Sequence, residues 1–160
     1  MGPLAAGGGR PYVSLVVAHW LLKTEPGTYS FEDLLRERIT AWTGVANRQA
    51  QANLRAMREG DRALVYHSGE KRAVGVAEVV RAAYPDPTAG GGDLVCVDVR
   101  AVEPLPAPVP LDLLRQERAF AGSPLLRQGR LSVVPLSQDQ WRAAQEAARR
   151  LASTPAARRS

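Results

Sequence analysis

Cysteine and histidine are scarce in this sequence. Its 160 residues include one cysteine, Cys96, and two histidines, His19 and His67. A single cysteine excludes an internal disulfide bond, and such sparing use suits a reducing compartment, so we expect a cytoplasmic protein. Two histidines and one cysteine, far apart along the chain, also make a poor set of zinc ligands, so we expect no bound metal.

Long apolar runs and cofactor-binding motifs are missing too. No stretch reaches the roughly 20 apolar residues that a membrane-spanning helix needs. The sequence contains no Walker loop, no Gly-x-Gly-x-x-Gly fingerprint and no His-Glu-x-x-His motif. The run Gly90-Gly91-Gly92 is not followed by the lysine and helix of a phosphate loop. We therefore expect neither a membrane anchor nor a cofactor.

The first residues superficially suggest a signal peptide, because Arg10 precedes an apolar stretch from Tyr12 to Ala18. That stretch continues into the motif Trp20–Glu25, which cleavage would damage or leave at the terminus. We instead predict a Gly-rich disordered extension over residues 1–17, one domain over residues 18–151 and a flexible tail over residues 152–160.

The charge balance of the chain is basic. Lys and Arg number 21 against 16 Asp and Glu, which gives a net charge of +5 and a pI near 10.0. A basic surface favours polyanionic partners such as nucleic acid. The alternative is compositional: nearly all the cations are arginine, as a GC-rich genome would impose, and four lie near the C-terminus, namely Arg149, Arg150, Arg158 and Arg159.

Strands are predicted where apolar, Val-rich segments lie between turn signals: residues 17–23, 62–67, 73–81, 94–103 and 131–134. The prolines at positions 104, 106, 108 and 110 predict an extended connector. Strands interrupted by helices indicate an α+β fold. We expect a small mixed β-barrel of about five to six strands, flanked by short helices.

Helices are predicted from caps and from the spacing of apolar residues. Ser30 and Ser137 begin capping-box sequences, and the helix that begins at Ser137 should continue to about Leu151. The apolar residues between Asn47 and Met57 recur at helical spacing and predict another helix there. A short helix is also expected after the last proline of the connector.

Polar residues gather where predicted strands end. The run Trp20-Leu21-Leu22-Lys23-Thr24-Glu25-Pro26 ends a strand with a cation, a hydroxyl and a carboxylate before a proline, which cannot donate to a sheet. Loops on a rigid scaffold commonly hold binding groups. Four later segments share this character: Trp42-Thr43-Gly44-Val45-Ala46-Asn47, Val65-Tyr66-His67-Ser68, Tyr84-Pro85-Asp86-Pro87-Thr88 and Gly129-Arg130-Leu131-Ser132-Val133-Val134-Pro135.

Several of these residues also have a purely structural interpretation. Trp42, in a polar Gly-containing loop, is a candidate stacking wall for a nucleic-acid base, but it can also fill one end of a core. Trp20 suits the core or the floor of a pocket equally. Lys23 and Glu25 share one strand face, where they can read the edge of a base or form a surface ion pair worth about 0–1 kcal/mol. His67 can bond a ligand or be a structural histidine.

Taken in order, the five segments resemble the EVE domain family, the PUA-like fold of the thymocyte nuclear protein group. The resemblance covers roughly His19 to Ala144. The chain departs from the family's common residues at Thr24, where serine is commoner, at Thr43, where an acidic residue is common, and at Ala46, where arginine is common. The loop after Asp86-Pro87-Thr88 is also short. The resemblance implies a small pocket that accepts a flipped, often modified, base.

On this basis we predict two sets of binding residues. Arg48, Arg55 and Arg58 lie on one face of the predicted helix 47–57 and are candidate phosphate contacts, although a solvated helix face is the alternative. The predicted base pocket comprises Trp20, Lys23, Thr24, Glu25, Trp42, Gly44, Val45, Asn47, Tyr66, His67, Ser68, Asp86, Arg130 and Ser132.

The predicted function is that of a non-enzymatic, monomeric module that binds DNA or RNA by accepting a flipped, modified base, for example a methylated one. The alternative is an ASCH-like hydrolase acting on modified nucleosides or RNA, in which Lys23, Glu25, Tyr66 or His67 would supply a nucleophile or base. Against it, no nucleophile, base and orienting group stand at a recognisable spacing. A third possibility is a protein-interaction adaptor whose pocket is vestigial.

Overall fold

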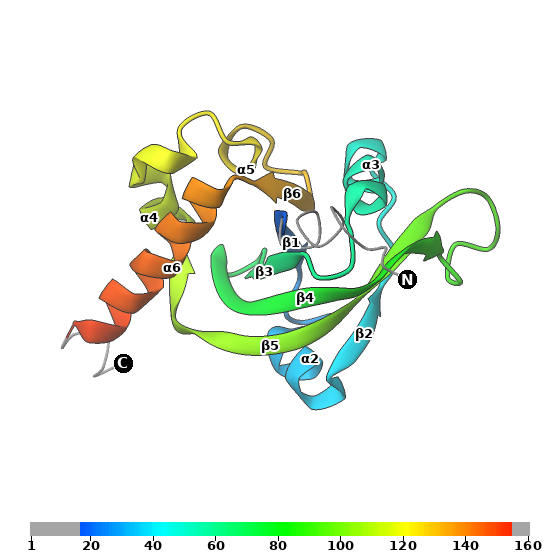
Figure 1. The fold of residues 1–160 in the computed structure, drawn as a ribbon, viewed down its shortest axis with the longest axis horizontal. Coiled ribbons are helices and arrows are strands. Elements are labelled where there is room, and N and C mark those ends of the chain that lie inside the picture. The colour runs from blue at the N-terminus through cyan, green and yellow to red at the C-terminus, as the bar shows by residue number, and fades with distance from the viewer. Residues whose placement is uncertain (1–16, 155–160) are drawn as a thin grey trace, which may run out of the picture.

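One mixed β-sheet organises the fold (Figure 1). The structure is a computed structural model and describes residues 17–154. In chain order its elements are β1 (His19–Thr24), α2 (Phe31–Glu37), β2 (Ile39–Trp42), α3 (Arg48–Ala56), β3 (Arg62–His67), β4 (Arg72–Pro85), β5 (Val95–Pro110), α4 (Leu111–Gln116), the 3-10 helix η1 (Arg118–Phe120), α5 (Pro124–Arg127), β6 (Val133–Leu136) and α6 (Gln138–Ser153).

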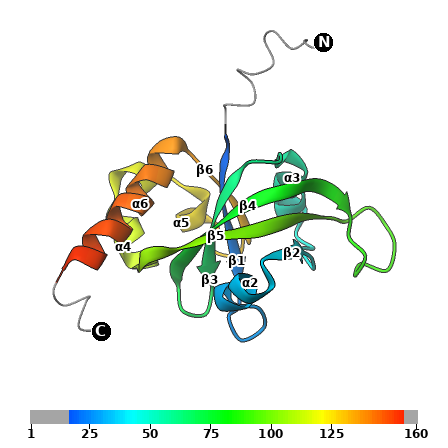
Figure 2. The ribbon, with the colours of Figure 1, turned by 60° about the horizontal axis from the view of Figure 1, so that its bottom comes forward.

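The six strands follow the order β2-β5-β4-β3-β1-β6 across the sheet. β1 runs parallel to β3, and the other neighbouring pairs are antiparallel. The register between the long strands β4 and β5 shifts at several points, and such bulges bend a sheet (Figures 1 and 2). Over the described residues the sheet is barrel-like but not closed. The predicted α+β fold, with a mixed barrel-like sheet and short flanking helices, is confirmed.

The proline-rich segment continues β5 instead of forming a connector, which corrects the prediction. Successive main-chain N–H groups of a strand point to opposite sides, so prolines at alternate positions lose donors along one edge. The ladder between β5 and β2 spans only residues 97–100 of β5, so beyond it that edge of β5 carries no strand. The other edge still pairs with β4 through Val109 and Ala73.

Three further features of the structure differ from what the sequence predicted. The strand β2 was not predicted, because four residues of mixed polarity give no clear period. The last strand lies at Val133–Leu136, slightly later than expected. α6 continues to Ser153, so the predicted tail does not begin at residue 152. The predicted N-terminal extension and the rest of the predicted tail fall almost entirely on residues 1–16 and 155–160, which lie outside the described residues.

One core joins the inner sheet face to the helices. Phe31, the first residue of α2, is buried and packs against Gly75 of β4, where a side chain would not fit: an added Cβ would lie 2.3 Å from the phenyl Cζ. No helix within residues 17–154 is long and apolar enough to cross a membrane. In the same part of the chain, no three His, Cys, Asp or Glu side chains lie close enough to hold a metal ion.

The close approach of Phe31 to Gly75 gives the first prediction. We expect Gly75→Ala to lower the free energy of unfolding by about 1–3 kcal/mol, because the methyl group overpacks a buried ring. Urea unfolding measures this. Gly27→Ala is the matched control, since an added Cβ meets no atom within 4 Å there. Equal stability of the two variants would contradict the packing.

Candidate functional site

The sheet does not close between β2 at one edge and the β1–β6 pair at the other, and we call this opening the seam. The seam holds a cavity of about 450 Å³. Its walls come from the end of β1, from the turn after it, from β2 with the loop that follows, and from the residue before β6. The order of the strands places β2 at one end of the sheet and β1 with β6 at the other, so the cavity lies between the two unpaired ends. The lining residues are Lys23, Thr24, Thr28, Tyr29, Thr40, Ala41, Trp42, Thr43, Gly44, Val45, Ala46 and Ser132.

The main chain of β2 contributes to this cavity. The Ala101 amide donates to the Arg38 carbonyl oxygen at 2.9 Å, and the ladder then pairs Thr40 with Val99 and Trp42 with Val97. In an antiparallel pair every second residue turns its N–H and C=O away from the partner strand. Ala41 therefore directs both main-chain groups away from β5, toward the seam.

Two aromatic rings form the apolar part of the wall. Trp42 and Tyr29 pack edge to face, with ring centroids 6.2 Å apart. Burial, with a contribution from the hydrogen bond to Glu37, raises the pKa of Tyr29 to about 12. The phenol is therefore protonated at neutral pH. Trp42 is 7% exposed and belongs to the core, yet it also lines the cavity. Both interpretations of this residue, as a stacking wall and as a core residue, are therefore compatible with its position.

Lys23 supplies the one cationic side chain among the lining residues. Its ammonium donates to the Gly129 carbonyl oxygen at 2.9 Å and lies 5.6 Å from the centre of the Tyr66 ring. Burial lowers the pKa of Lys23. Tyr66 is itself buried, so it acts as a platform under the ammonium instead of lining the cavity as predicted. The remaining polar lining groups are hydroxyls: Thr24, Thr28, Thr40, Thr43 and Ser132.

The loop after β2 is held by polar side chains behind it. Asp86 accepts hydrogen bonds from the Gly44 amide at 2.9 Å and from both the amide and the hydroxyl of Thr88 at 2.7 Å. Gly44 has a φ of +77°, a conformation that favours glycine. Burial alone would raise the pKa of Asp86, but the hydrogen bonds from Thr88 and Gly44 outweigh it and hold the pKa below its usual value.

The start of α3 is fixed in the same manner. Asn47 was predicted in the pocket, but its side chain caps the helix by accepting from the Ala50 amide. Gln51, one turn further along the helix, is buried. Its amide group donates to the carbonyl oxygens of Val45 and Val95 and accepts from the Val95 amide. Gln51 thus ties the cavity loop to β5.

The other predicted pocket residues lie away from the cavity. Trp20 is buried, and its indole donates at 3.0 Å to Asp61, a carboxylate that also accepts the amides of Ala18 and Arg58. This corrects its placement: Trp20 belongs to the core.

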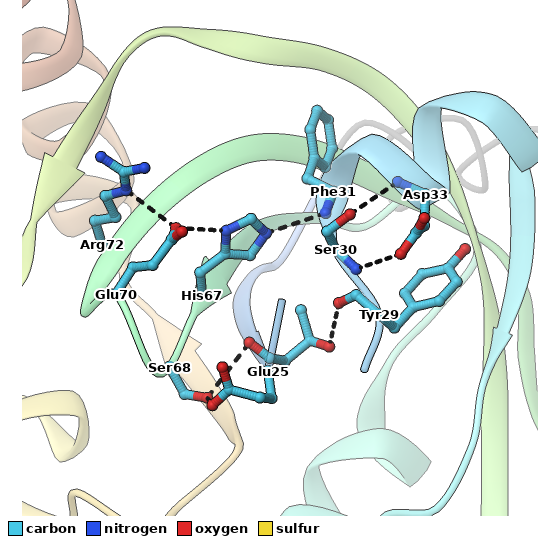
Figure 3. A network of polar contacts seen from close by, with 10 residues as sticks. Glu25, Tyr29, Ser30, Phe31, Asp33, His67, Ser68, Glu70 and Arg72 are labelled. Carbon is cyan, nitrogen blue, oxygen red and sulfur yellow. Dashed lines mark hydrogen bonds and ion pairs between the residues drawn. The ribbon is translucent and has the colours of Figure 1, made fainter. Parts of the chain in front are cut away.

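Glu25, Ser68 and His67, drawn in Figure 3, are not among the residues that line the cavity. Glu25 is exposed and reaches the Ser68 hydroxyl at 3.4 Å. The ring of His67 bonds to the main chain of Phe31 and to Glu70. The structure therefore brings none of the three to the cavity wall.

The predicted phosphate contacts lie along α3 and just beyond its end. Arg48 is exposed at the start of α3, directly after the cavity loop. The guanidinium of Arg55 donates to the Asp93 carbonyl oxygen, and Arg58 is exposed beyond the end of the helix. Arg130 was predicted in the base pocket, but it is exposed next to Gly129, the partner of Lys23, and does not line the cavity.

Comparison with known proteins identifies the family of this chain. The family description EVE domain matches residues 18–147. Human thymocyte nuclear protein 1 is 32% identical over an alignment that covers 78% of this chain and 71% of the human protein. The chain belongs to the EVE domain family. The predicted resemblance is confirmed.

Solved EVE domain structures superpose on most of the chain. A Rhodopseudomonas palustris protein is 42% identical, with a TM-score of 0.78, over 84% of this chain and 95% of that one. The human THYN1 protein, solved in complex with DNA containing 5-methylcytosine, is 31% identical, with a TM-score of 0.73, over 82% of this chain and 97% of the human chain.

Six lining residues of this EVE domain were missing from the predicted pocket: Thr28, Tyr29, Thr40, Ala41, Thr43 and Ala46. Thr43 and Ala46 belong to the segment Trp42–Asn47, which the sequence did single out. Thr40 and Ala41 lie on β2, the strand that was not predicted. Thr28 and Tyr29 lie in a turn closed by their own amides, which donate to the Glu25 carbonyl oxygen. Their one available signal was their position between the Glu25-Pro26 strand end and the Ser30 cap.

The bonds to Asp86 give the second prediction. A carboxyl group whose folded-state pKa is depressed stabilises the fold above its ordinary pKa and loses that contribution as the pH falls through the folded-state value. We expect Asp86→Asn to cost about 1–3 kcal/mol at neutral pH. The difference from wild type should shrink below about pH 4.

Urea unfolding at neutral and acid pH measures both quantities. Asp93→Asn, on the same exposed loop, is the control. If Asp86→Asn is no less stable than this control at neutral pH, Asp86 does not brace the loop.

Proposed function

We propose that this EVE domain binds nucleic acid by accepting a flipped, modified base in the seam cavity. The observation that carries the proposal is the cavity itself, which combines an aromatic wall, hydroxyls and an outward-facing strand edge. Its volume of about 450 Å³ lies within the range of small-ligand pockets. A base offers a π-face to Trp42 and an edge with donors and acceptors to the polar groups.

The human relative supports the choice of ligand. THYN1 was solved with DNA containing 5-methylcytosine and shares 31% identity with this chain. We therefore propose a methylated pyrimidine in DNA as the first ligand to test, with the same base in RNA as the second. Flipping costs a few kcal/mol, and stacking contributes about 1–3 kcal/mol per base. Burial of one methyl group adds roughly 0.8 kcal/mol.

A binding module is favoured over a hydrolase by where the reactive side chains point. Glu25 and His67, the candidate bases, are engaged outside the cavity. Lys23 is bonded to a carbonyl oxygen. A turnover assay on modified nucleosides and oligonucleotides distinguishes the classes: product release would favour the hydrolase. Monomeric state and cytoplasmic localisation stay predictions.

A binding screen at one fixed salt concentration tests the proposal. Oligonucleotides that differ only in one base, cytosine or 5-methylcytosine, are presented as single-stranded DNA, duplex DNA and RNA. Tighter binding of the methylated member in at least one series is expected. Equal affinity for both members of every series would contradict modified-base recognition, and absence of all binding would favour the adaptor function.

The third prediction concerns the aromatic wall. Trp42→Leu should weaken binding of both the plain and the modified base, because a stacking face worth about 1–3 kcal/mol is removed. It should also abolish most of the preference between them, because a base that no longer stacks in the cavity cannot bury its methyl group there. Both Trp42 and Trp141 are at least partly buried, so replacement of either should lower stability. Trp141→Leu is therefore the matched control, since Trp141 stacks on His19 outside the cavity lining. The measurement is the ratio of the affinities for the modified and the unmodified oligonucleotide, made on folded protein of each variant. Loss of the preference in both variants, or in neither, would contradict the assignment of Trp42.

The fourth prediction concerns the phosphate track. Arg48→Gln with Arg55→Gln should weaken binding to modified and unmodified oligonucleotides equally. The slope of log affinity against log salt should flatten by about 0.9 for each phosphate of duplex DNA that the variant no longer neutralises. The control is Arg142→Gln with Arg149→Gln on α6, which lies at the other end of the molecule from α3 (Figure 1). If the control flattens the slope and the α3 variant does not, the phosphates of the nucleic acid contact α6 instead of α3.

A further inference from the structure

His67 bridges the end of β3 and the start of α2 (Figure 3). The ring is 3% exposed. Its Nε2 atom accepts a hydrogen bond from the Phe31 amide at 3.0 Å, and its Nδ1 atom lies 2.9 Å from a carboxylate oxygen of Glu70. An amide can only donate, so Nε2 must be unprotonated, and Nδ1 carries the proton that is donated to Glu70.

The Phe31 amide belongs to the segment that forms the cavity wall. Phe31 follows the cap residue Ser30, and Tyr29, which lines the cavity, comes directly before that cap. The Tyr29 carbonyl oxygen accepts from the Thr24 hydroxyl at 2.7 Å, and the Tyr29 amide donates to the Glu25 carbonyl oxygen at 2.8 Å. The wall is thus attached to β1 on one side and, through His67, to β3 on the other.

Protonation of the ring would break the second attachment. With a proton on Nε2, two donors would face each other, because the Phe31 amide cannot reverse its role. The Glu70 carboxylate continues to accept from Nδ1–H in either state, so protonation costs the bond to Phe31 alone. An unmade hydrogen bond at a buried amide is costly, and moving the start of α2 away from the ring relieves it.

Charged side chains from the turn after β3, from β4 and from α2 lie near the His67 ring. Glu70 comes from the turn between β3 and β4, and Arg72 begins β4 and bonds to the same Glu70 oxygen at 3.2 Å. Hydrogen bonds from His67 and Arg72 hold the pKa of Glu70 below its usual value, so Glu70 is ionised throughout the range in which histidines titrate. Glu32 of α2 lines a cavity that His67, Glu70 and Arg72 also line.

Protons can reach the ring without unfolding. His67, Glu70 and Arg72 border a second cavity of about 370 Å³, here called the outer cavity, which lies between α2 and the proline-rich part of β5 and is also lined by Phe31 and Glu32. This outer cavity is separate from the seam cavity, with which it shares no lining residue.

We propose that His67 is a positioning residue of the seam cavity, and that protonation of its Nε2 releases the Thr28–Tyr29 wall and weakens ligand binding. The proposal rests on the proposed function for its binding readout. Binding is complete while the ring is neutral and declines as the pH falls and the ring takes up a proton. Loss of the bond predicts weaker binding, and because one histidine takes up at most one proton between about pH 8 and about pH 5.5, the expected weakening is about 5- to 10-fold.

The affinity for the preferred oligonucleotide, measured at about pH 8 and about pH 5.5, gives one ratio per variant. Wild type should show the predicted weakening on acidification. His67→Gln should show a ratio near one, because the glutamine oxygen can accept from Phe31 but does not titrate. His19→Gln, which removes the other histidine of the chain, is the control and should keep the wild-type ratio. A flat wild-type ratio, or the wild-type ratio in His67→Gln, overturns the proposal.

Nuclear magnetic resonance supplies a readout that needs no ligand. The ring ¹⁵N shifts of His67 should report a proton on Nδ1 alone at about pH 8 and on both nitrogens at about pH 5.5. Hydrogen exchange of the Phe31 and Tyr29 amides, corrected for intrinsic rates, should accelerate as Nε2 becomes protonated.

Unchanged protection of these amides with a protonated ring would overturn the proposal even if no oligonucleotide bound. If the exchange behaves as expected but nothing binds at either pH, the proposed function fails and the role of His67 in holding the wall stands. The same measurements on wild type decide the matter if His67→Gln does not fold.

Discussion

The unpaired seam of the sheet is the constraint on which the rest of the structure depends. A closed barrel of this size would fill its interior with side chains and leave no room for a ligand. Here β2 and the β1–β6 pair end the sheet without meeting, over the residues that the structure describes. An unpaired strand edge presents main-chain donors and acceptors that need partners. The cavity therefore inherits polar groups from β2 that no side chain has to supply.

Buried polar side chains fix the width of this seam. His67 bonds to the start of α2, Asp86 to the loop after β2, and Gln51 to both that loop and β5. Within residues 17–154, no buried side-chain nitrogen or oxygen lacks a hydrogen-bond partner. Because an unsatisfied buried group costs about 1–3 kcal/mol, each brace favours a single loop geometry. The cavity is thus held from behind, by residues that do not line it.

Local signals made most elements predictable, whereas long-range pairing did not. The caps at Ser30 and Ser137 form the capping boxes that their sequences indicate. The strand β2 depends on β5, more than fifty residues away along the chain, and no local pattern reveals that pairing. The motifs located the regions around the cavity but not the direction of each side chain. A polar group at a strand end bonds a ligand or a neighbouring amide equally well, and for His67 and Asp86 only the fold decided.

The composition of the cavity wall favours selection by shape over selection by charge. A hydroxyl both donates and accepts, so the threonines and Ser132 can adapt to different base edges. Burial of a methyl group contributes roughly 0.8 kcal/mol, whereas overpacking costs about 1–3 kcal/mol. Rejection of a substituent that is too large is therefore easier than preference for a small one. Thr24, Thr43 and Ala46, where the chain departs from the family's common residues, all lie on this wall. Under the proposed function, the choice of base would therefore depend on these wall positions, whereas the hydrogen bonds of Asp86, Gln51 and His67 hold the loops behind them.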